Sequence, residues 1–427
     1  MNKKYLTAGP GGLSNTFSPG VAGRPGPALT IRRGCGSLTA MPTAGTKRAA
    51  LLLGAAVVLG ALFFLKARSG MADFDVNFKA GQRLLAGETL YRTEDSHWQF
   101  KYSPFSALMY APLSLLPLGA AKTVWFVLVA AALAAVVLLS ARLLSASGPL
   151  GGWAVGLTAA VLAKFFFREL QLGQINAVIT VLLLAMTIEM EKAADPGPAS
   201  GAADVRAGLL WGLATALKPY AVIFLPYFVL RRRARALLAG LAFIAASLAV
   251  PALFYGFQGS GTVLREWADS LARSTPVLFG TQDNVSLMGL FVKWTGDVRL
   301  STLLLGGATA LLAGLIFSAV RRGNKMDHPL PLESALLLLA IPLLSPLGWD
   351  YTFLSAFPAI LLVFRSWDRF PSAARVLLAV NAAMIGLALY DLFGRRLYAA
   401  FMARSVPTVN FLVVAAALFY LRSRRAA

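Results

Sequence analysis

The apolar positions of this chain fall in long runs that are separated by short polar or basic segments. Most runs hold roughly 17–25 residues, enough for one helix to cross a hydrocarbon layer of about 30 Å. Twelve runs stand out, at about 49–65, 103–118, 120–143, 149–167, 172–190, 207–230, 236–255, 300–320, 331–346, 350–365, 372–391 and 407–421. The pattern predicts an all-α polytopic membrane protein with about 12 transmembrane helices.

Composition supports a membrane protein. Of the 427 residues 57% are hydrophobic and only 14% are charged, and the mean hydropathy is +0.67, whereas a soluble domain carries about a quarter charged residues. The single cysteine, Cys35, provides neither a disulfide nor a thiolate metal site. His97 and His328 are the only histidines, which argues against histidine-based metal or acid–base chemistry.

The net charge of +21 comes mostly from basic residues at the ends of apolar runs. Such placement sets membrane orientation, so we expect no nucleic-acid partner. The clusters lie at 47–48, 231–235, 321–325, 365–369 and 422–425. All five fall on one side if the chain crosses twelve times with both termini in the cytoplasm. Two long loops, at about 66–102 and 256–299, are then external.

The N-terminal segment differs from the rest of the chain. Residues 1–46 are rich in Gly, Pro, Ser and Thr, carry basic but no acidic residues, and lack an apolar signal segment; we expect a disordered basic cytoplasmic tail. Residues 47–425 form the predicted transmembrane domain.

Arg395 and Arg396 lie in the last external loop, whereas basic residues are usually in excess on the cytoplasmic side. Either this loop is a chance exception to that rule, or it faces an anionic head group.

Asp73 and Asp75 follow the first apolar run on the external side. Two carboxylates two residues apart suit a divalent cation, and one alone suits a general base. A solvated loop explains the pattern equally well. Further along, Lys101 and Tyr102 lie in the segment Phe-Lys-Tyr-Ser-Pro-Phe at 100–105. Its aromatic and proline content is typical of a chain that re-enters the membrane interface.

A third set of polar residues, at 168–176, interrupts the apolar pattern near the middle of the chain. Polar side chains are costly in lipid unless they face protein or a wet cavity. Lys218 lies within another apolar run and needs an anionic partner, for which a lipid phosphate or Glu169 would serve; a purely structural buried pair is the alternative. The interrupting residues are Arg168, Glu169, Gln171, Gln174 and Asn176.

A fourth set of polar residues lies in two segments, the second external loop and the connection between the ninth and tenth apolar runs. Asn284 and Ser286 lie in the former, Trp349 and Asp350 in the latter. Both segments fall on the side of Asp73, so they can share one cavity with it; helix capping is the alternative reading of the aspartates. The sequence shows no Walker loop, His-Glu-x-x-His motif or Ser/His/Asp order.

Several of these segments together resemble the polyprenol-phosphate-mannose-dependent mannosyltransferases of glycosyltransferase family 87. The resemblance covers roughly residues 48–425. It is carried by DFDVNFKAGQRLLAGETLY with KYSPFSALMYAPLSLLP, then ELQLGQINAVI, GLLWGLATALKPYAVIFLPYFVLRRR, DNVSLMGL and PLLSPLGWDYTFL, in the family's order.

The resemblance implies a GT-C fold with an external active site, a sugar donor on a polyprenyl phosphate, a lipid or glycan acceptor, and inversion at the sugar. An essential aspartate in the first external loop acts as base in this pattern. Asp73 matches it best, because Asp73-Phe74 corresponds to the family's Asp-Phe pair, and Asp75 is the second candidate. The aromatic pair expected four to five residues later reads Asn77-Phe78 here, a departure that keeps both carboxylates as candidates. Many such enzymes need no metal, so we expect neither metal nor cofactor. The implied location is a bacterial inner membrane with a periplasmic site.

Roles for the other polar residues follow from the same resemblance and from charge. A polyprenyl phosphate leaving group needs cations more than an acid. The candidates for holding its phosphate are Arg168, Lys218, Lys101, Arg395 and Arg396. The candidates for contacting substrate are Tyr102, Glu169, Gln171, Gln174, Asn176, Asn284, Ser286, Trp349 and Asp350.

Two other functions suit a chain of this kind. A secondary transporter or flippase of lipid-linked sugars also has about twelve spans with interrupted helices, but usually has two related halves. Here the two long loops differ in sequence and in their position within each half. A membrane scaffold without enzymatic activity is the third possibility.

Overall fold

The computed structural model describes residues 54, 58–145, 148–194, 197–321 and 329–423. Residues 58–427 form one compact unit. The predicted tail at 1–46 and residues 49–53 and 55–57 of the first apolar run lie outside the described residues. Within the described ranges the chain is helical, without a strand, and an isolated bridge joins Asn284 to Trp349.

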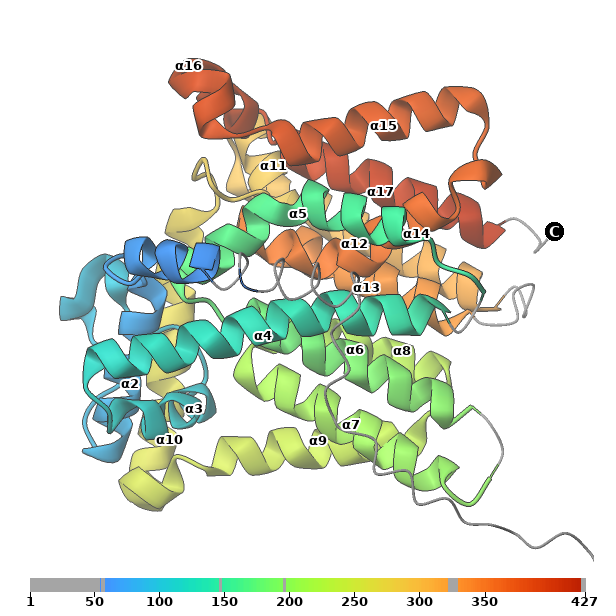
Figure 1. The fold of residues 1–427 in the computed structure, drawn as a ribbon. Coiled ribbons are helices and arrows are strands. Elements are labelled where there is room, and N and C mark those ends of the chain that lie inside the picture. The colour runs from blue at the N-terminus through green and yellow to red at the C-terminus, as the bar shows by residue number, and fades with distance from the viewer. Residues whose placement is uncertain (1–53, 55–57, 146–147, 195–196, 322–328, 424–427) are drawn as a thin grey trace, which may run out of the picture. The chain divides into compact units, whose positions relative to one another are not determined.

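The helices follow one another with short connections (Figure 1). After the segment Val58–Ala67, the α-helices are α2 (Ala72–Leu85), α3 (Pro104–Ser114), α4 (Leu118–Ser145), α5 (Gly152–Leu172), α6 (Asn176–Lys192), α7 (Ser200–Leu217), α8 (Leu225–Leu230), α9 (Ala234–Ala249), α10 (Ala252–Ser274), α11 (Leu287–Thr295), α12 (Val298–Arg321), α13 (Leu330–Leu344), α14 (Phe357–Arg365), α15 (Ser372–Leu387), α16 (Tyr390–Ala403) and α17 (Val406–Ser423). Short 3-10 helices are η1 (Thr93–Trp98), η2 (Pro219–Phe224), η3 (Pro276–Leu278), η4 (Asp350–Ala356) and η5 (Trp367–Arg369).

Three of these helices, α4, α12 and α17, are long and apolar enough to cross a membrane. Three bent pairs also pass the test, namely α5 with α6, α9 with α10, and α15 with α16, which gives up to six spans if each pair counts as one. Shorter apolar helices lie at Val58–Ala67, Pro219–Leu230 and Leu330–Leu344. The described chain is thus an all-helical polytopic membrane protein.

The predicted span at 103–118 is wrong. Helix α3 has 11 residues, about 16 Å at 1.5 Å per residue, which is half of what a hydrocarbon core requires. Ser103 caps its start by accepting a bond from the Ser106 N–H at 3.3 Å. Helix α3 packs instead along α2, so closely that a Cβ added at Gly81 would lie 2.9 Å from the Tyr110 carbonyl.

The predicted single span at 207–230 is also wrong, because the chain reverses at Lys218. This residue is extended (φ −148°, ψ 112°) and precedes Pro219. Lys218 contacts Asn176 at the start of α6, whereas Arg233 donates to the Ala193 carbonyl beyond its end. Residues 200–233 therefore form two antiparallel legs.

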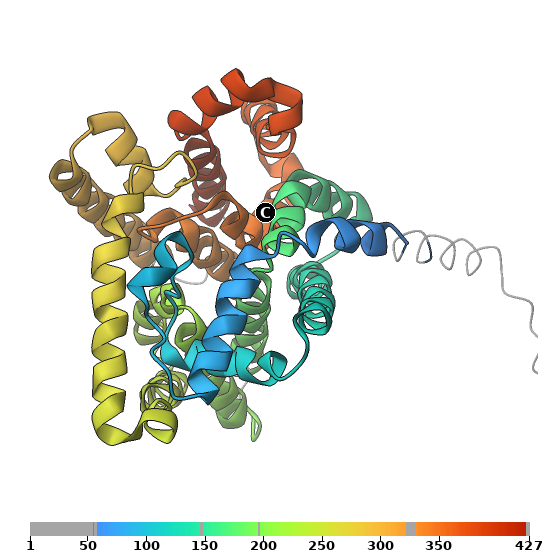
Figure 2. The same ribbon diagram turned by 90° about the vertical axis from the view of Figure 1, so that its left-hand side faces the viewer.

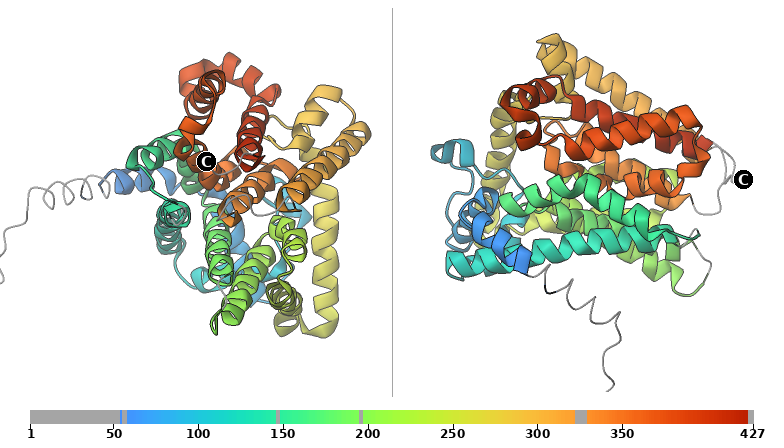
Figure 3. Two further views of the ribbon diagram at one scale, coloured as in Figure 1. Left: turned by 90° about the vertical axis from the view of Figure 1, so that its right-hand side faces the viewer. Right: turned by 45° about the horizontal axis from the view of Figure 1, so that its top comes forward.

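The long helices lie side by side, as α4, α6, α7 and α9 show in Figure 1, and two ends of the unit can be distinguished. We call the first the site end: it carries α2, α3 and the turn between α5 and α6, and the long α10 lies across it (Figures 2 and 3). At the other, basic end, Arg365 donates to the Leu144 carbonyl at 2.7 Å, and buried Glu333 pairs with Arg231 and Arg422.

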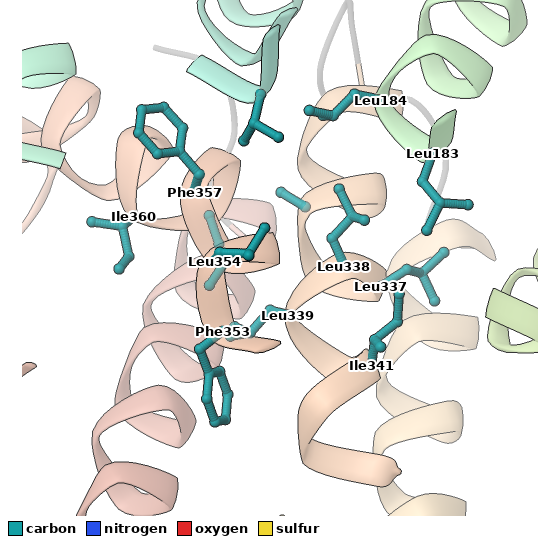
Figure 4. Close-up of a cluster of buried hydrophobic side chains, with 14 of the residues drawn as sticks. Leu183, Leu184, Leu337, Leu338, Leu339, Ile341, Phe353, Leu354, Phe357 and Ile360 are labelled. Carbon is teal, nitrogen blue, oxygen red and sulfur yellow. The ribbon is translucent and has the colours of Figure 1, made fainter. Parts of the chain in front are cut away.

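The apolar core lies between the C-terminal helices and α6. Leucines of α13 face Phe353 and Phe357 of η4 and α14, as Figure 4 shows. The Phe353 ring stacks on Phe411 of α17, with the two ring centroids 3.7 Å apart. This packing fixes η4, which begins at Asp350 at the site end.

Candidate active site

A tight turn between α5 and α6 positions α2 over the centre of the site end. Gly173 has φ +68°, in the left-handed region that favours glycine. A Cβ added there would lie 2.7 Å from the Phe74 Cβ, so glycine is also required by the close approach of α2. The Gly173 carbonyl accepts a bond from Trp125 Nε1 at 2.8 Å. The turn thereby holds Gln174 against Asp73, the neighbour of Phe74.

Asp73 binds the Gln174 amide directly. Gln174 Nε2 donates to Asp73 Oδ2 at 2.6 Å and to the Tyr351 hydroxyl at 3.0 Å. Tyr102 OH in turn donates to Gln174 Oε1 at 3.4 Å. Gln174 itself is buried, while Asp73 is partly exposed. The carboxylate is therefore fixed on one side by protein and remains accessible on another.

Asn176 connects a buried carboxylate to a lysine. Its Nδ2 donates to Glu169 Oε2 at 2.9 Å, and its Oδ1 accepts from Lys218 Nζ at 2.7 Å and from Tyr220 OH at 3.1 Å. Glu169 is fully buried and also accepts the Ala177 N–H at 2.9 Å. Lys218 Nζ lies 5.2 Å from the ring centroid of Tyr220, within the range of a cation–π contact.

These contacts fix how both amides point. Asn176 Oδ1 faces two donors, so its NH2 group faces Glu169 and, at 3.4 Å, Gln174 Oε1. Because Gln174 Oε1 accepts from Asn176, the Gln174 NH2 group faces Asp73. A continuous chain of hydrogen bonds thus runs from Lys218 to Asp73, and each donor and acceptor is used in the one orientation that satisfies its neighbours.

Asp75 faces a different partner. Its carboxylate pairs with Lys122 Nζ of α4 at 2.9 Å, and the same ammonium donates to the Arg68 carbonyl at 3.1 Å. Lys122 is buried, and Asp75 is the negative charge in contact with it. Of the two predicted carboxylates, Asp73 belongs to the polar chain of the site and Asp75 to an ion pair that joins α2 to α4.

The predicted cations do not all lie together. Lys101 is half-buried close to Asp73; burial lowers the pKa of Lys101, and the nearby Asp73 carboxylate opposes that shift. Arg168 is exposed and interacts electrostatically with Asp350. The predicted cations on α16 are exposed as well, and Arg395 Nε bonds the Tyr390 hydroxyl of its own helix at 3.0 Å. Lys101 and Lys218 are thus the two that interact with Asp73.

The structure brings together the 283–287 and 344–351 segments, as the sequence predicts. Val285 N donates to the Gly348 carbonyl at 2.7 Å. The Asn284 amide is fully engaged with backbone: Nδ2 bonds the Phe279 and Pro346 carbonyls, and Oδ1 accepts the N–H groups of Ser286 and Gly348. These contacts favour a structural role for Asn284.

The remaining candidates near these segments have local contacts. Ser286 caps α11 by accepting from the Gly289 N–H at 3.0 Å, and Asp350 Oδ1 accepts from the Tyr351 N–H at 2.7 Å. Trp349 forms the bridge with Asn284. Gln171 is exposed.

Three residues in or beside the site were not among the predicted ones. Tyr220 and Tyr351 belong to sequence segments that stood out, but a tyrosine in an apolar run gives no sign of its own that its hydroxyl reaches a buried amide. Lys122 opens a long apolar helix, where a basic residue reads as a membrane-end charge. Its contact with Asp75 depends on the packing of α4 beside α2.

The geometry suits proton transfer beside an anion. A partly exposed carboxylate, held by one amide and interacting electrostatically with two ammonium groups, can accept a proton while a negative charge develops nearby. Among the described residues, no group of three or more His, Cys, Asp or Glu side chains is placed to hold a metal ion.

Comparison with known families identifies the chain. The family description "Glycosyltransferase family 87" matches residues 100–346, more than half of the 427 residues. The chain belongs to glycosyltransferase family 87. The matched segment of this family 87 protein contains Tyr102, the α5–α6 turn and Lys218. Asp73 lies ahead of it, so the role of Asp73 rests on its contacts.

Two relatives of this family 87 protein come from Mycobacterium tuberculosis. It is 28% identical over 313 residues to the polyprenol-phosphate-mannose-dependent alpha-(1-2)-phosphatidylinositol mannoside mannosyltransferase, with 68% of each chain covered. It is 26% identical over 355 residues to the corresponding phosphatidylinositol pentamannoside mannosyltransferase, covering 80% of this chain and 77% of that one. No solved structure matches the protein.

Membership and composition together establish the general character of the protein. It is an integral membrane glycosyltransferase, and relatives that take sugars from a lipid carrier to a glycolipid support a donor and an acceptor of those general kinds. The expectation from sequence resemblance is therefore confirmed at the level of the family.

Proposed function

We propose that this protein transfers a hexose, most simply mannose, from a polyprenyl phosphate to the hydroxyl of a glycolipid or glycan, with inversion at the anomeric carbon. The observation that carries the proposal is Asp73, held by Gln174 at 2.6 Å and linked through Gln174 and Asn176 to Lys218, with Lys101 also interacting electrostatically with it. The relatives' use of polyprenol-phosphate-mannose, printed in their names, supports the choice of donor.

In this mechanism Asp73 is the base. Its carboxylate takes the proton of the acceptor hydroxyl as that oxygen bonds to the anomeric carbon, and the bond from that carbon to the phosphate oxygen breaks. The electron pair leaves with the polyprenyl phosphate, whose charge Lys101 and Lys218 balance. A single base on the face opposite the leaving group gives inversion. We propose that these cations act without a metal, so that a chelator leaves the rate unchanged.

We also propose an orientation. The arginines of the basic end, with Arg231, Arg233, Arg365 and Arg422 held at helix ends, match the excess of basic residues on the cytoplasmic side of membrane proteins. The site end then faces outward, to the periplasm of a bacterial inner membrane. Twelve crossings result if the first apolar run spans and the legs on either side of Lys218 count separately.

Cysteine labelling tests this orientation. In a Cys35→Ser background, Ser96→Cys and Asp269→Cys are expected to react with a membrane-impermeant maleimide in intact spheroplasts, because both positions are exposed at the site end. Ala234→Cys, exposed at the basic end, is the matched control and should react only after lysis. Ser260 lies in the same loop but is buried, so it is unsuitable. Protection of both external positions would refute the orientation.

Reconstitution tests the proposed reaction against transport. Purified protein in sealed proteoliposomes is given polyprenyl-phosphate mannose labelled in the sugar, together with phosphatidylinositol mannoside as acceptor. We expect label in the acceptor and intact donor on the side where it was supplied. Movement of unchanged donor across the bilayer, without transfer, would instead support a flippase, and neither event would support a scaffold.

Gln174 offers a test of how the base is held. Gln174→Leu removes the donor that bonds the ionised Asp73 carboxylate, and a carboxylate without such a bond accepts a proton at higher pH. The acidic limb of the pH profile of kcat/KM is therefore expected to shift to higher pH, with a smaller change at the alkaline side. Gln171→Leu, on the exposed neighbouring turn, is the matched control. An unshifted profile with a uniformly lower rate would mean that Gln174 is only structural.

A further inference from the structure

A cavity lies along α2, on a stripe of the helix that does not include Asp73. Its volume is about 390 Å³, within the range of about 300–1,000 Å³ typical of small-molecule sites. One wall is a single stripe of the helix, at Asp75, Lys79 and Arg83, whose spacing of four residues places them on one face. The other wall comes from the η1 segment, with Asp95, Trp98 and Phe100. We call this cavity the α2 groove.

Ion pairs hold the polar side chains of the α2 groove in place. Arg83 donates through both terminal nitrogens to Asp95, at 2.5 and 2.9 Å, which fastens η1 to α2. This guanidinium holds the pKa of Asp95 below its usual range. At Asp75 the Lys122 ammonium completes a second pair. The polar groups are therefore ordered before any ligand binds, which reduces the entropy lost on binding.

The charge of the α2 groove favours a neutral ligand. Its lining contains two carboxylates and two cations, Lys79 and Arg83, so the formal charges cancel. Arg83 is already paired with Asp95 and Asp75 with Lys122. A phosphate would find Lys79 as the one lining cation outside these close pairs, whereas anion sites usually gather several donors.

The aromatic residues complete a pattern that suits a sugar ring. Trp98 is 53% exposed and offers its ring to the cavity, and the lining also includes Phe100, which is 1% exposed. A pyranose has a face of C–H groups that packs on an aromatic ring and an edge of hydroxyls that bonds fixed carboxylate, guanidinium and ammonium groups. The α2 groove offers both kinds of partner within one cavity.

We propose that the α2 groove binds a neutral sugar residue of the acceptor glycan, one that does not react. This inference rests on the proposed function, because α2 carries Asp73 and the groove on two different faces at the same end of the protein. The acceptor would then be a glycolipid with several sugars, extending past the first turn of α2, where Ala72 lines the groove. A single-sugar acceptor would reach Asp73 without using the α2 groove.

Acceptors of different length test this assignment. With purified full-length protein in nanodiscs, Trp98→Ala is expected to raise the KM for a phosphatidylinositol tetramannoside by about 3- to 10-fold, from the loss of one aromatic contact. The KM for a monomannoside acceptor and for the donor should stay at parental values. Lys79→Gln, at an exposed position, should raise the long acceptor's KM about 2- to 5-fold. Trp153→Ala, 59% exposed at the basic end, is the matched control.

A binding measurement separates this inference from the proposed function. Free mannotetraose is added to parental protein and to the Trp98 variant, and contact is detected by saturation-transfer NMR. Binding that is lost in Trp98→Ala supports the α2 groove even if no sugar transfer is found. Unchanged binding by both Trp98→Ala and Lys79→Gln, or equal effects on long and short acceptors, would overturn the assignment while leaving the proposed transfer reaction in place.

Discussion

Replacing Asp73 by Asn is expected to lower the rate of sugar transfer by about 10²–10⁴-fold, the usual contribution of a general base. The amide keeps the shape of the side chain and can still bond the Gln174 side chain, but it accepts no proton at neutral pH. Expression and donor binding should remain at parental levels. Initial rates in nanodiscs, with donor affinity measured separately, check this expectation.

Asp75→Asn is the matched control, since it changes a carboxylate of the same helical turn. It weakens the pair with buried Lys122, so the melting temperature should fall, while turnover per folded molecule should drop far less than in Asp73→Asn. Near-parental turnover by Asp73→Asn would remove Asp73 from the mechanism. An inactive but folded Asp75→Asn would transfer the role of base to Asp75.

The second large effect is expected at Lys218. Lys218→Ala should lower kcat/KM for the donor by about 10- to 150-fold, corresponding to roughly 1.5–3 kcal/mol for a lost hydrogen bond to a charged group. The KM for the acceptor should change much less. Lys218→Arg should recover part of the activity, because the charge is kept while the geometry differs.

Lys164 provides a control for the loss of a partly buried lysine. It bonds the Ala388 carbonyl at 3.1 Å and lies over the Phe165 ring, away from the hydrogen-bonded chain that ends at Asp73. Lys164→Ala should therefore leave the donor KM near the parental value. If Lys218→Ala is folded and its donor KM is also unchanged, Lys218 serves only to orient Asn176.

The sequence singled out polar residues that the structure brings together, but it did not show how they are connected. Polar residues inside apolar runs are costly unless they meet protein or a wet cavity. This rule singled out Glu169, Gln174, Asn176 and Lys218, which the structure joins in one hydrogen-bonded chain. It also singled out Arg168 and Gln171, which are exposed. The rule gives no pairing, however. That Lys218 meets Asn176 directly, and not Glu169, depends on the geometry of the α5–α6 turn.

The two wrong spans have a common physical origin. Hydropathy measures how apolar a segment is, not the direction in which it runs. Residues 103–118 are apolar because α3 packs along α2, and residues 207–230 form one apolar run although the chain reverses at Lys218. The Lys218-Pro219 pair was a usable signal for that reversal, because the residue before a proline is biased away from helical conformation.

The anomeric configuration of the product tests the central claim most directly. Donor labelled with ¹³C at the anomeric carbon is converted in a single turnover by the purified protein in nanodiscs, and the one-bond carbon–proton coupling is read in donor and product. Transfer by one base, Asp73, predicts a product with the configuration opposite to that of the donor. A product of unchanged configuration would require a covalent sugar–enzyme intermediate and would contradict the account.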